Sequence, residues 1–282
     1  MISIRFEEKQ QIGLQYALET LHGCSPFGQE KIRRLRFYTP AERGELETEL
    51  YNVRQAALHA EQLKSVYDKI CILLCQMKDI RNSIRRCRDG EIPDHVELFE
   101  IKGYLQRLES LLPLYAQMCE IAPLRELSFH DPKPALDILD PDSTRSRGFY
   151  IPDSMTEKLQ QLRRSKKTLE EQLHNASTDA EKDELRLQRT RVCAEEESEE
   201  TKIRRAMGAR LAPLAEDMLE DAESVGRLDF ILQKALFAVR YGGVMPEITD
   251  GALELTDMVN PELCDLLTEQ GRSFVPVSIS LN

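Results

Sequence analysis

The 282-residue sequence contains no tryptophan, and aromatic residues make up only 6% of it. No stretch approaches the ~18 consecutive apolar residues of a membrane span, and charges occupy the N-terminal positions where a signal peptide has its apolar run. The seven cysteines include no CxxC pair and the five histidines no HxxxH pair. These absences exclude membrane, collagen-like and secreted disulfide-rich classes, predict no metal site, and make a reducing cytoplasm the expected compartment.

The charge balance limits which partners the chain can bind. It has 38 Lys+Arg against 49 Asp+Glu, a formal net charge of −11. A chain this acidic is not a general nucleic-acid coat, so any DNA contact has to come from a local basic patch. The phosphate-binding motif GxxxxGK[ST] is absent, as are GxGxxG and GxSxG. The chain itself is therefore not expected to be an enzyme, and we expect no cofactor held by this chain alone.

Apolar residues recur at helical spacing through most of the chain, which predicts an all-α fold. Single helices are expected over residues 6–22 and 66–87. Ser25, followed by a proline, is a helix start signal, and Thr39 with Glu42 forms a capping-box pattern at the start of another helix. The predicted fold is a helical bundle core with a long antiparallel helical hairpin and a short β edge at the C-terminus.

The hairpin is predicted from an a/d seam, in which apolar positions alternate at spacings of four and three. Its members on the first arm are Met155, Leu159, Leu162, Lys166, Leu169 and Leu173. Residues 175–179 read as a short turn with capping residues, and a longer second arm follows. An arm of ~20 residues would be about 30 Å long.

The expected organisation has five parts: a helical core over 1–130, an irregular connection over 131–153, the hairpin over 154–222, a return helix of the core over 223–250, and the β edge over 251–282. The connection is rich in proline, which forbids a continuous helix. It also carries too many large apolar residues to be left in water, so we expect it to be ordered.

Basic residues gather on the hairpin. From 160 to 192 there are eight Lys/Arg against six Asp/Glu, a local positive excess in a chain that carries −11 overall. If residues i and roughly 352 − i face each other, the two arms bring these side chains together: Arg163, Arg164, Lys166, Lys167, Lys182, Arg186, Arg189 and Arg191. We interpret them as a candidate DNA contact or, alternatively, as the charged surface of an exposed coiled coil. The five glutamates between 195 and 200 are interpreted as a solvated helix face, as is the cluster Lys31, Arg33, Arg34 and Arg36.

Several ordered blocks carry a resemblance to a known family. The first is "ALETLHGCSPFGQEKIRRLRFYTP" at 17–40, followed by "MKDIRNSIRRCRDGEI" and "VELFEIKGYL". The most specific is "VGRLDFILQKALFAVRYGGVMPEI" at 225–248, and the last is "NPELCDLLTEQGRSFVPVSISL" at 260–281. Together they resemble the core and lever region of the MutS family of mismatch-repair and recombination-control ATPases. The chain departs from the family pattern because it lacks the mismatch-reading domain and the clamp between the lever helices, and because it has Asn260-Pro261 where His-Pro is common.

The resemblance implies a core-and-lever module that couples the nucleotide state of an adjoining ATPase domain to DNA or partner binding. Residues 251–282 would be the start of that domain. ATP and magnesium would bind in its remainder, which this chain does not include, and a homodimer would form through it. Phe274 matches an aromatic position that can stack on adenine; a strand residue buried in the sheet is the alternative. Double-stranded DNA would be a weak or indirect partner, contacted through Arg163, Arg164, Lys166, Lys167, Arg186 and Arg189. The alternative function is a non-catalytic helical scaffold that docks a protein partner through its coiled-coil hairpin.

The absent phosphate loop generates the first prediction. We expect the purified chain neither to bind nor to hydrolyse ATP, because no backbone cradle for the phosphates is encoded. Magnesium-dependent phosphate release by the purified chain, measured in a steady-state assay, would contradict this.

Overall fold

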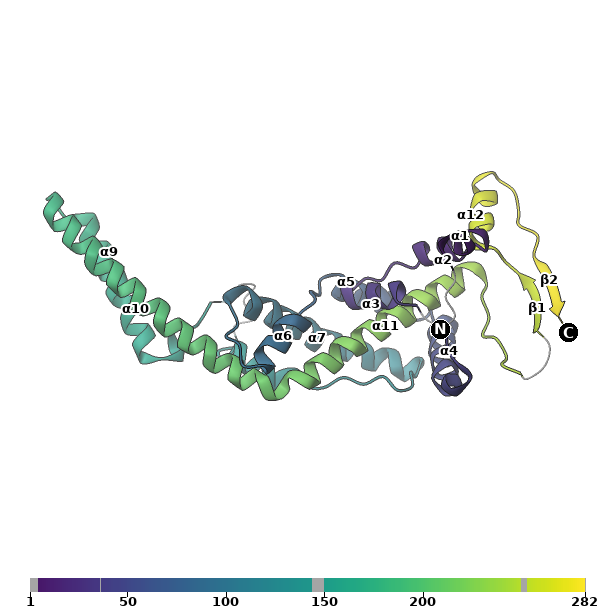
Figure 1. Ribbon diagram of the computed structural model, residues 1–282, viewed down its shortest axis with the longest axis horizontal. Helices are drawn as coiled ribbons and strands as arrows, with labels where there is room; N and C mark the ends of the chain where they lie inside the picture. Colours follow the sequence, from purple (N-terminus) through teal and green to yellow (C-terminus); the bar gives the residue numbers. More distant parts are fainter. Residues whose placement is uncertain (1–4, 36, 144–149, 250–252, 282) are drawn as a thin grey trace. The chain divides into compact units, whose positions relative to one another are not determined.

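The computed structural model describes residues 5–35, 37–143, 150–249 and 253–281. Helices account for most of the described regular structure, which confirms the all-α prediction, and one small two-stranded sheet lies near the C-terminus (Figure 1). The chain divides into two compact units. The core unit comprises Met1–Met77, Ser110–Phe129 and Asp221–Asn282, and the hairpin unit comprises Lys78–Glu109 and His130–Glu220.

The elements of the core unit are short or medium-length helices and the sheet: α1 (Phe6–Gln11), α2 (Leu14–Thr20), α3 (Pro26–Arg33), η1 (Pro40–Glu42), α4 (Arg43–Leu58), α5 (Lys64–Cys75), α12 (Pro261–Glu269), β1 (Leu253–Met258) and β2 (Val277–Leu281). Two long helices, α7 (His95–Ile121) and α11 (Ala215–Tyr241), contribute residues to both units.

A buried carboxylate organises the centre of the core unit. Asp229 of α11 accepts hydrogen bonds from the Ser25 backbone N–H at 2.7 Å, the Ser25 hydroxyl at 2.7 Å and the Cys24 N–H at 3.1 Å. The Ser25 Oγ also accepts from the Gly28 N–H at 3.0 Å, which confirms the predicted helix start. A Cβ at Gly28 would lie 2.1 Å from Asp229 Oδ2, so only glycine fits there.

A second carboxylate joins three helices of the core unit. Asp265 of α12 accepts hydrogen bonds from the Tyr16 hydroxyl of α2 at 2.6 Å and the Tyr241 hydroxyl of α11 at 2.7 Å. The Arg240 guanidinium completes the set at 2.8 Å. These donors, the Tyr16 hydroxyl first, hold the pKa of Asp265 below its ordinary value. Asn260 caps the same helix by accepting from the Leu263 N–H at 3.2 Å.

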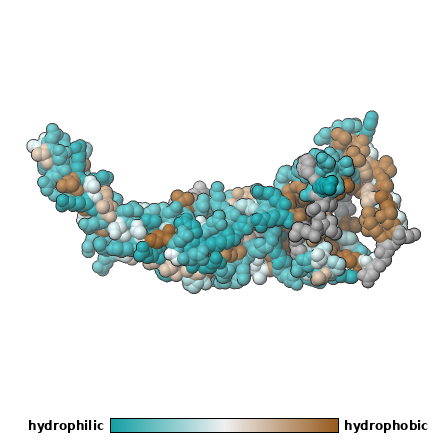
Figure 2. Space-filling model, viewed as in Figure 1, coloured by the Kyte–Doolittle hydropathy of each residue, from teal (hydrophilic) through white to brown (hydrophobic). Residues whose placement is uncertain are grey.

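The sheet consists of β1 and β2 in antiparallel register, with Leu253 opposite Leu281 and Leu255 opposite Ile279. The register shifts between Leu255 and Met258, where Asp257 adopts a positive φ of 52°. Except for the half-buried Met258, the apolar side chains of both strands are exposed, and Figure 2 shows apolar surface gathered at the right-hand end of the view, where the strands lie. Such a two-stranded element buries little surface of its own.

The hairpin unit contains α6 (Arg81–Arg88), α8 (Lys133–Leu139), η2 (Asp153–Met155), α9 (Glu157–Asn175), α10 (Asp179–Leu211) and η3 (Ala212–Leu214), with the adjoining parts of α7 and α11. The expected division placed residues 78–109 with the core. They group instead with the hairpin because α6 packs on α10. The expected irregular connection includes the helix α8, which buries four of its seven residues.

A buried ion pair joins two helices of the hairpin unit. Lys102 Nζ of α7 lies 3.2 Å from Asp140 Oδ1, immediately after α8, and both side chains are buried. Paired charges can be buried at this depth only because each neutralises the other. The contact fixes the C-terminal end of α8 against α7.

The helices α9 and α10 run side by side as the predicted antiparallel hairpin (Figure 1). The turn lies where expected, since α9 ends at Asn175 and Thr178 caps α10 by accepting from the Glu181 N–H at 3.3 Å. The seam is buried near the base of the hairpin, at Leu159 and Leu162. Towards the turn, the seam residues are only half-buried.

Two predicted helices are interrupted. The helix expected over 6–22 breaks at Gly13, whose φ of 73° ends α1, and Ile12 is exposed rather than part of an apolar face. The helix expected over 66–87 stops at Cys75, and α6 begins at Arg81. There the Asp79 carboxylate accepts from the Arg81 N–H at 3.2 Å, an Asx-type contact that competes with helical bonding.

The depth of the seam predicts a graded effect of a carboxylate along it. Leu162 is 9% exposed, whereas Leu187 on α10 is 54% exposed. Leu162→Asp should destabilise the protein by about 2–5 kcal/mol because it buries an unpaired charge. The half-buried Leu169→Asp should cost less than Leu162→Asp, and the matched control Leu187→Asp should change stability by less than about 0.5 kcal/mol. Thermal unfolding followed by circular dichroism measures this order, and equal melting temperatures for all three variants would show that the seam was misassigned.

Candidate functional site

The basic residues of the hairpin separate into two groups with different surroundings. Arg163 and Lys166 of α9 face α10 and are held by carboxylates of that helix. The others are exposed or half-buried along the hairpin: Arg164, Lys167, Lys182, Arg186, Arg189 and Arg191. The two groups have to be assessed separately, because only an exposed cation can reach a phosphate.

Arg163 is the centre of a network at the base of the hairpin. Its guanidinium donates to Glu200 at 2.7 Å, to Glu196 at 3.2 Å and to the carbonyl oxygen of Ile151 at 2.7 Å, and it also binds Asp153. It lies 4.1 Å from the ring centroid of Tyr150, within cation–π range. The side chain is only 10% exposed. We call this cluster the Arg163 network.

The electrostatics of the Arg163 network favour its charged form. Burial by itself lowers the pKa of Arg163, but the hydrogen bonds to Asp153, Glu200 and Glu196 outweigh burial and raise that pKa above its ordinary value. In return, the Arg163 guanidinium holds the pKa of the Asp153 carboxyl below its ordinary 3.8. The stabilisation of the folded protein by the ion pair of Asp153 with Arg163 is fully present above pH 3.8, and it is lost as the pH falls through the lower pKa that Asp153 has in the folded state.

The carboxylates of the network correct one sequence interpretation. The five glutamates between 195 and 200 were expected to form a solvated helix face. Glu196 and Glu199 are buried, and Glu200 is half-buried. Glu196 pairs with both Arg163 and Lys166, and the latter contact raises the pKa of Lys166. The local signal was the spacing of these acids, which places several of them on the side of α10 that meets α9.

The exposed group has weaker ties. Arg189 pairs with Glu170 at 2.9 Å and Arg186 with Asp183 at 3.1 Å, and all four side chains are more than two-fifths exposed. Exposed ion pairs contribute about 0–1 kcal/mol, so a phosphate can displace the carboxylate at little cost. Within the described part of the hairpin, Arg164, Lys167 and Arg191 make no ion pair. These side chains can bind an anion without first breaking a contact.

The pairing between the arms differs from the expected one. Arg163 was expected to face Arg189, but it contacts Glu196, seven positions further along α10, and Arg189 contacts Glu170. Helical side chains point towards the N-terminus of their own helix, so they reach partners offset from the backbone register. The basic residues of the two arms are consequently interleaved with acids rather than gathered into one patch.

Phe274 and the second basic cluster lie in the core unit. Phe274 is half-buried in the irregular segment before β2. At the C-terminal end of α3, Arg33 and Arg34 are exposed, and Arg34, directly after the helix, pairs with Glu30. Arg36 lies outside the described residues.

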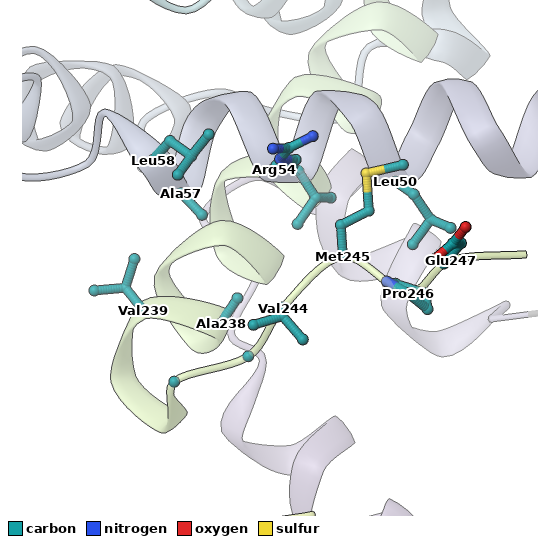
Figure 3. Close-up of a pocket in the computed structure, with 13 residues that line it drawn as sticks. Leu50, Arg54, Ala57, Leu58, Ala238, Val239, Val244, Met245, Pro246 and Glu247 are labelled. Carbon is teal, nitrogen blue, oxygen red and sulfur yellow. The ribbon is translucent and has the colours of Figure 1, made fainter. Parts of the chain in front are cut away.

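The core unit also has an apolar groove with a volume of about 730 Å³. It lies between α4 and the C-terminal end of α11 with the segment that follows (Figure 3), and its apolar lining includes Leu50, Leu58, Val239, Val244 and Met245. Arg54 and Glu247 are its charged residues. No nucleophile and base lie together among the lining residues, so the groove gives no basis for catalysis.

Metal sites, membrane-spanning helices and known relatives give little further evidence about the function of the chain. Within the described ranges, no group of three or more His, Cys, Asp or Glu residues is arranged to hold a metal ion. No helix in those ranges is both long and apolar enough to cross a membrane. No protein-family model matches the chain, and no curated protein matches it either.

The Arg163 network generates a stability prediction. Arg163→Met should destabilise the protein by about 3–5 kcal/mol, because it removes one of the two cations that pair with the buried Glu196 and the guanidinium that pairs with the half-buried Glu200. The neighbouring Arg164→Met is the control and should be near neutral, since Arg164 is exposed. Chemical denaturation of both variants measures the difference. Adding Glu196→Met to Arg163→Met should recover part of the loss; strict additivity of the two substitutions would show that the residues are not coupled.

Proposed function

We propose that this chain is the core-and-lever module of a MutS-like DNA mismatch-repair or recombination-control ATPase. In this role it couples the nucleotide state of an adjoining ATPase domain to binding of DNA or a partner. ATP and magnesium bind at that adjoining domain, and a homodimer forms through it. DNA contact by the module itself is weak and comes from the exposed basic residues of the hairpin.

The observation that carries the proposal is the contact between two of the resembling blocks. The opening block supplies Ser25 and Gly28, and the block at 225–248 supplies Asp229. These residues meet in one buried hydrogen-bonded site, in which Ser25 donates to Asp229 and Gly28 leaves room for it. A chance resemblance in two separate segments has no reason to fall on residues that depend on each other.

The hairpin has the properties that a lever needs. Its base is closed by the buried seam at Leu159 and Leu162 and by the Arg163 network. Packed helices have discrete arrangements rather than a continuous range, so a displacement at one end is carried to the other. The turn of three residues between α9 and α10 leaves no room for a clamp.

The exposed apolar surface of β1 and β2 supports the proposal that another domain adjoins this sheet. Leu253, Val277 and Leu281 are each more than half exposed, although they are large apolar residues in a regular sheet. Exposed apolar patches of this kind usually mark surfaces that another element covers. In the proposed role, this sheet is the entry to the ATPase domain, and Phe274 lies at the edge of the adenine site.

The alternative is a helical scaffold that docks a protein partner through the hairpin. It is favoured by the interleaving of acids and bases on the two arms, as in the pair of Arg189 with Glu170. An interface of mixed charge suits a protein partner with complementary charges better than it suits the uniformly negative DNA backbone.

DNA-binding measurements with charge-matched variants distinguish these functions. Arg164→Glu/Lys167→Glu on α9 should weaken duplex binding, measured by fluorescence anisotropy at low salt. It should also lower the steepness of the log–log salt dependence by roughly 0.9 for each phosphate that is no longer neutralised. Arg186→Glu/Arg189→Glu should act in the same way. The control, Arg33→Glu/Arg34→Glu on α3, changes the net charge equally and should leave binding unchanged.

The remaining outcomes have definite meanings. Loss of binding in the α3 control with intact binding in both hairpin variants would make the hairpin mechanism wrong. Absence of any salt-sensitive binding by the unmodified chain would favour the scaffold. Arg163 is left unchanged in all variants, because its reversal would disrupt the Arg163 network and confuse folding with DNA binding.

A further inference from the structure

Three cysteine thiols of the core unit lie together at the start of α3. Cys24 precedes the helix, and Cys71 and Cys75 are one turn apart on α5 and therefore on one face of it. Gln233 Nε2 of α11 lies 3.4 Å from the Cys24 sulfur and 3.9 Å from the Cys71 sulfur. Cys24 and Cys71 are half-buried, whereas Cys75 is exposed.

Gln233 connects Cys24 with Cys71. Its side-chain amide contacts both sulfurs, so the two thiols lie around one hydrogen-bond donor. A disulfide between Cys71 and Cys75 is disfavoured, because a helix keeps the Cβ atoms of residues one turn apart further from each other than an S–S bond allows. Cys24 comes from a different segment and has no such restraint, which makes it the natural partner for a thiol of α5.

We propose that Cys24 and Cys71 form a redox site that a hydroperoxide oxidises to a disulfide. The oxidant belongs to the peroxide class, and the product is a covalent link between α5 and the segment that precedes α3. This inference does not depend on the proposed function, because it rests on the packing of the core unit alone.

The reaction balances with hydrogen peroxide as the oxidant. The Cys71 thiolate attacks one peroxide oxygen, so that an S–O bond forms, the O–O bond breaks and hydroxide leaves; Cys71 is oxidised to the sulfenic acid. The Cys24 sulfur then attacks the Cys71 sulfur, the S–S bond forms, and the S–O bond breaks with release of a second hydroxide. The two thiol protons convert both hydroxides to water. In total, two thiols and one peroxide give one disulfide and two waters.

The surroundings assign the two thiols to these roles. The hydrogen bond from Cys24 lowers the pKa of Cys71 below its ordinary value, although burial and Asp229 oppose this. The same hydrogen bond, together with burial, raises the pKa of Cys24. Cys71 is thus the thiol that ionises first and attacks the oxidant, and Cys24 is the thiol that resolves the sulfenic acid.

The link would reinforce the central contact of the core unit. Cys24 donates its backbone N–H to Asp229, and its neighbour Ser25 makes the two shorter bonds. A disulfide at Cys24 ties this segment to α5 and closes a long loop, which restricts the unfolded chain. The oxidised protein should therefore unfold at a higher urea concentration than the reduced protein.

Peptide mapping with matched variants tests the pairing. The full chain is treated with hydrogen peroxide, the remaining thiols are alkylated, and tryptic peptides are compared with and without reduction. Cys71 and Cys75 fall in the same tryptic peptide, 70–78, so variants are needed to tell them apart. The unmodified chain and Cys75→Ser should both give a reducible link from Cys24 to this peptide, with a mass about 2 Da below the sum of the two thiol peptides. Cys71→Ser and Cys24→Ser should give none.

Either of two results would overturn the proposal. A link that persists in Cys71→Ser and disappears in Cys75→Ser would assign the disulfide to Cys75 instead. Oxidation of Cys24 and Cys71 to sulfinic acids without any link would show that the thiols cannot reach each other. Circular dichroism of the reduced variants shows whether each variant folds. The urea midpoint of unfolding should rise on oxidation of Cys75→Ser but not on oxidation of Cys71→Ser, which separates a missing disulfide from a failure to fold.

Discussion

The Asp229 carboxylate is the group on which the core unit depends. It is fully buried and accepts hydrogen bonds from two backbone N–H groups and the Ser25 hydroxyl, so its charge is stabilised by donors rather than by a cation. Burial nevertheless raises its pKa against the effect of these donors. A buried carboxylate is tolerated only when hydrogen-bond donors surround its oxygens. This requirement fixes the start of α3 against α11 and requires glycine at position 28.

The hairpin unit contains a comparable network, which surrounds a positive charge instead of a negative one. Arg163 is a half-buried cation surrounded by carboxylates, a carbonyl oxygen and an aromatic ring. Replacing such a network by apolar residues of similar size could cost little, so stability alone does not account for it. What a buried network does provide is a single alignment of α9 against α10, because its hydrogen bonds can be satisfied in only one register. In the proposed lever role, this single alignment matters more than additional stability.

Local chemistry predicted the elements better than their interruptions and contacts. Ser25 and the turn at 175–179 were identified from sequence because a cap depends on residues only three positions apart. The break at Gly13 was missed because the apolar pattern runs through it, and glycine is tolerated within helices. The basic residues of the hairpin were found by counting charges. Their division into a group paired with acids of α10 and an exposed group could not be predicted, because it depends on the rotation of α9 about its axis and on which acids of α10 it meets.

The two ends of the hairpin therefore differ in a way that suits binding at one end only. At the base, Arg163 cannot change partners without losing its hydrogen bonds to the buried Glu196 and the half-buried Glu200, so this end is fixed. Towards the turn, ion pairs such as that of Arg189 with Glu170 are exposed to solvent, and salt screens exposed charges over about 10 Å at 0.1 M ionic strength. Cations there can exchange a carboxylate for a phosphate or for a partner's acid while the base keeps its alignment. In the proposed role, a fixed base with exchangeable charges beyond it would let the hairpin bind and release a partner while its two helices stay paired.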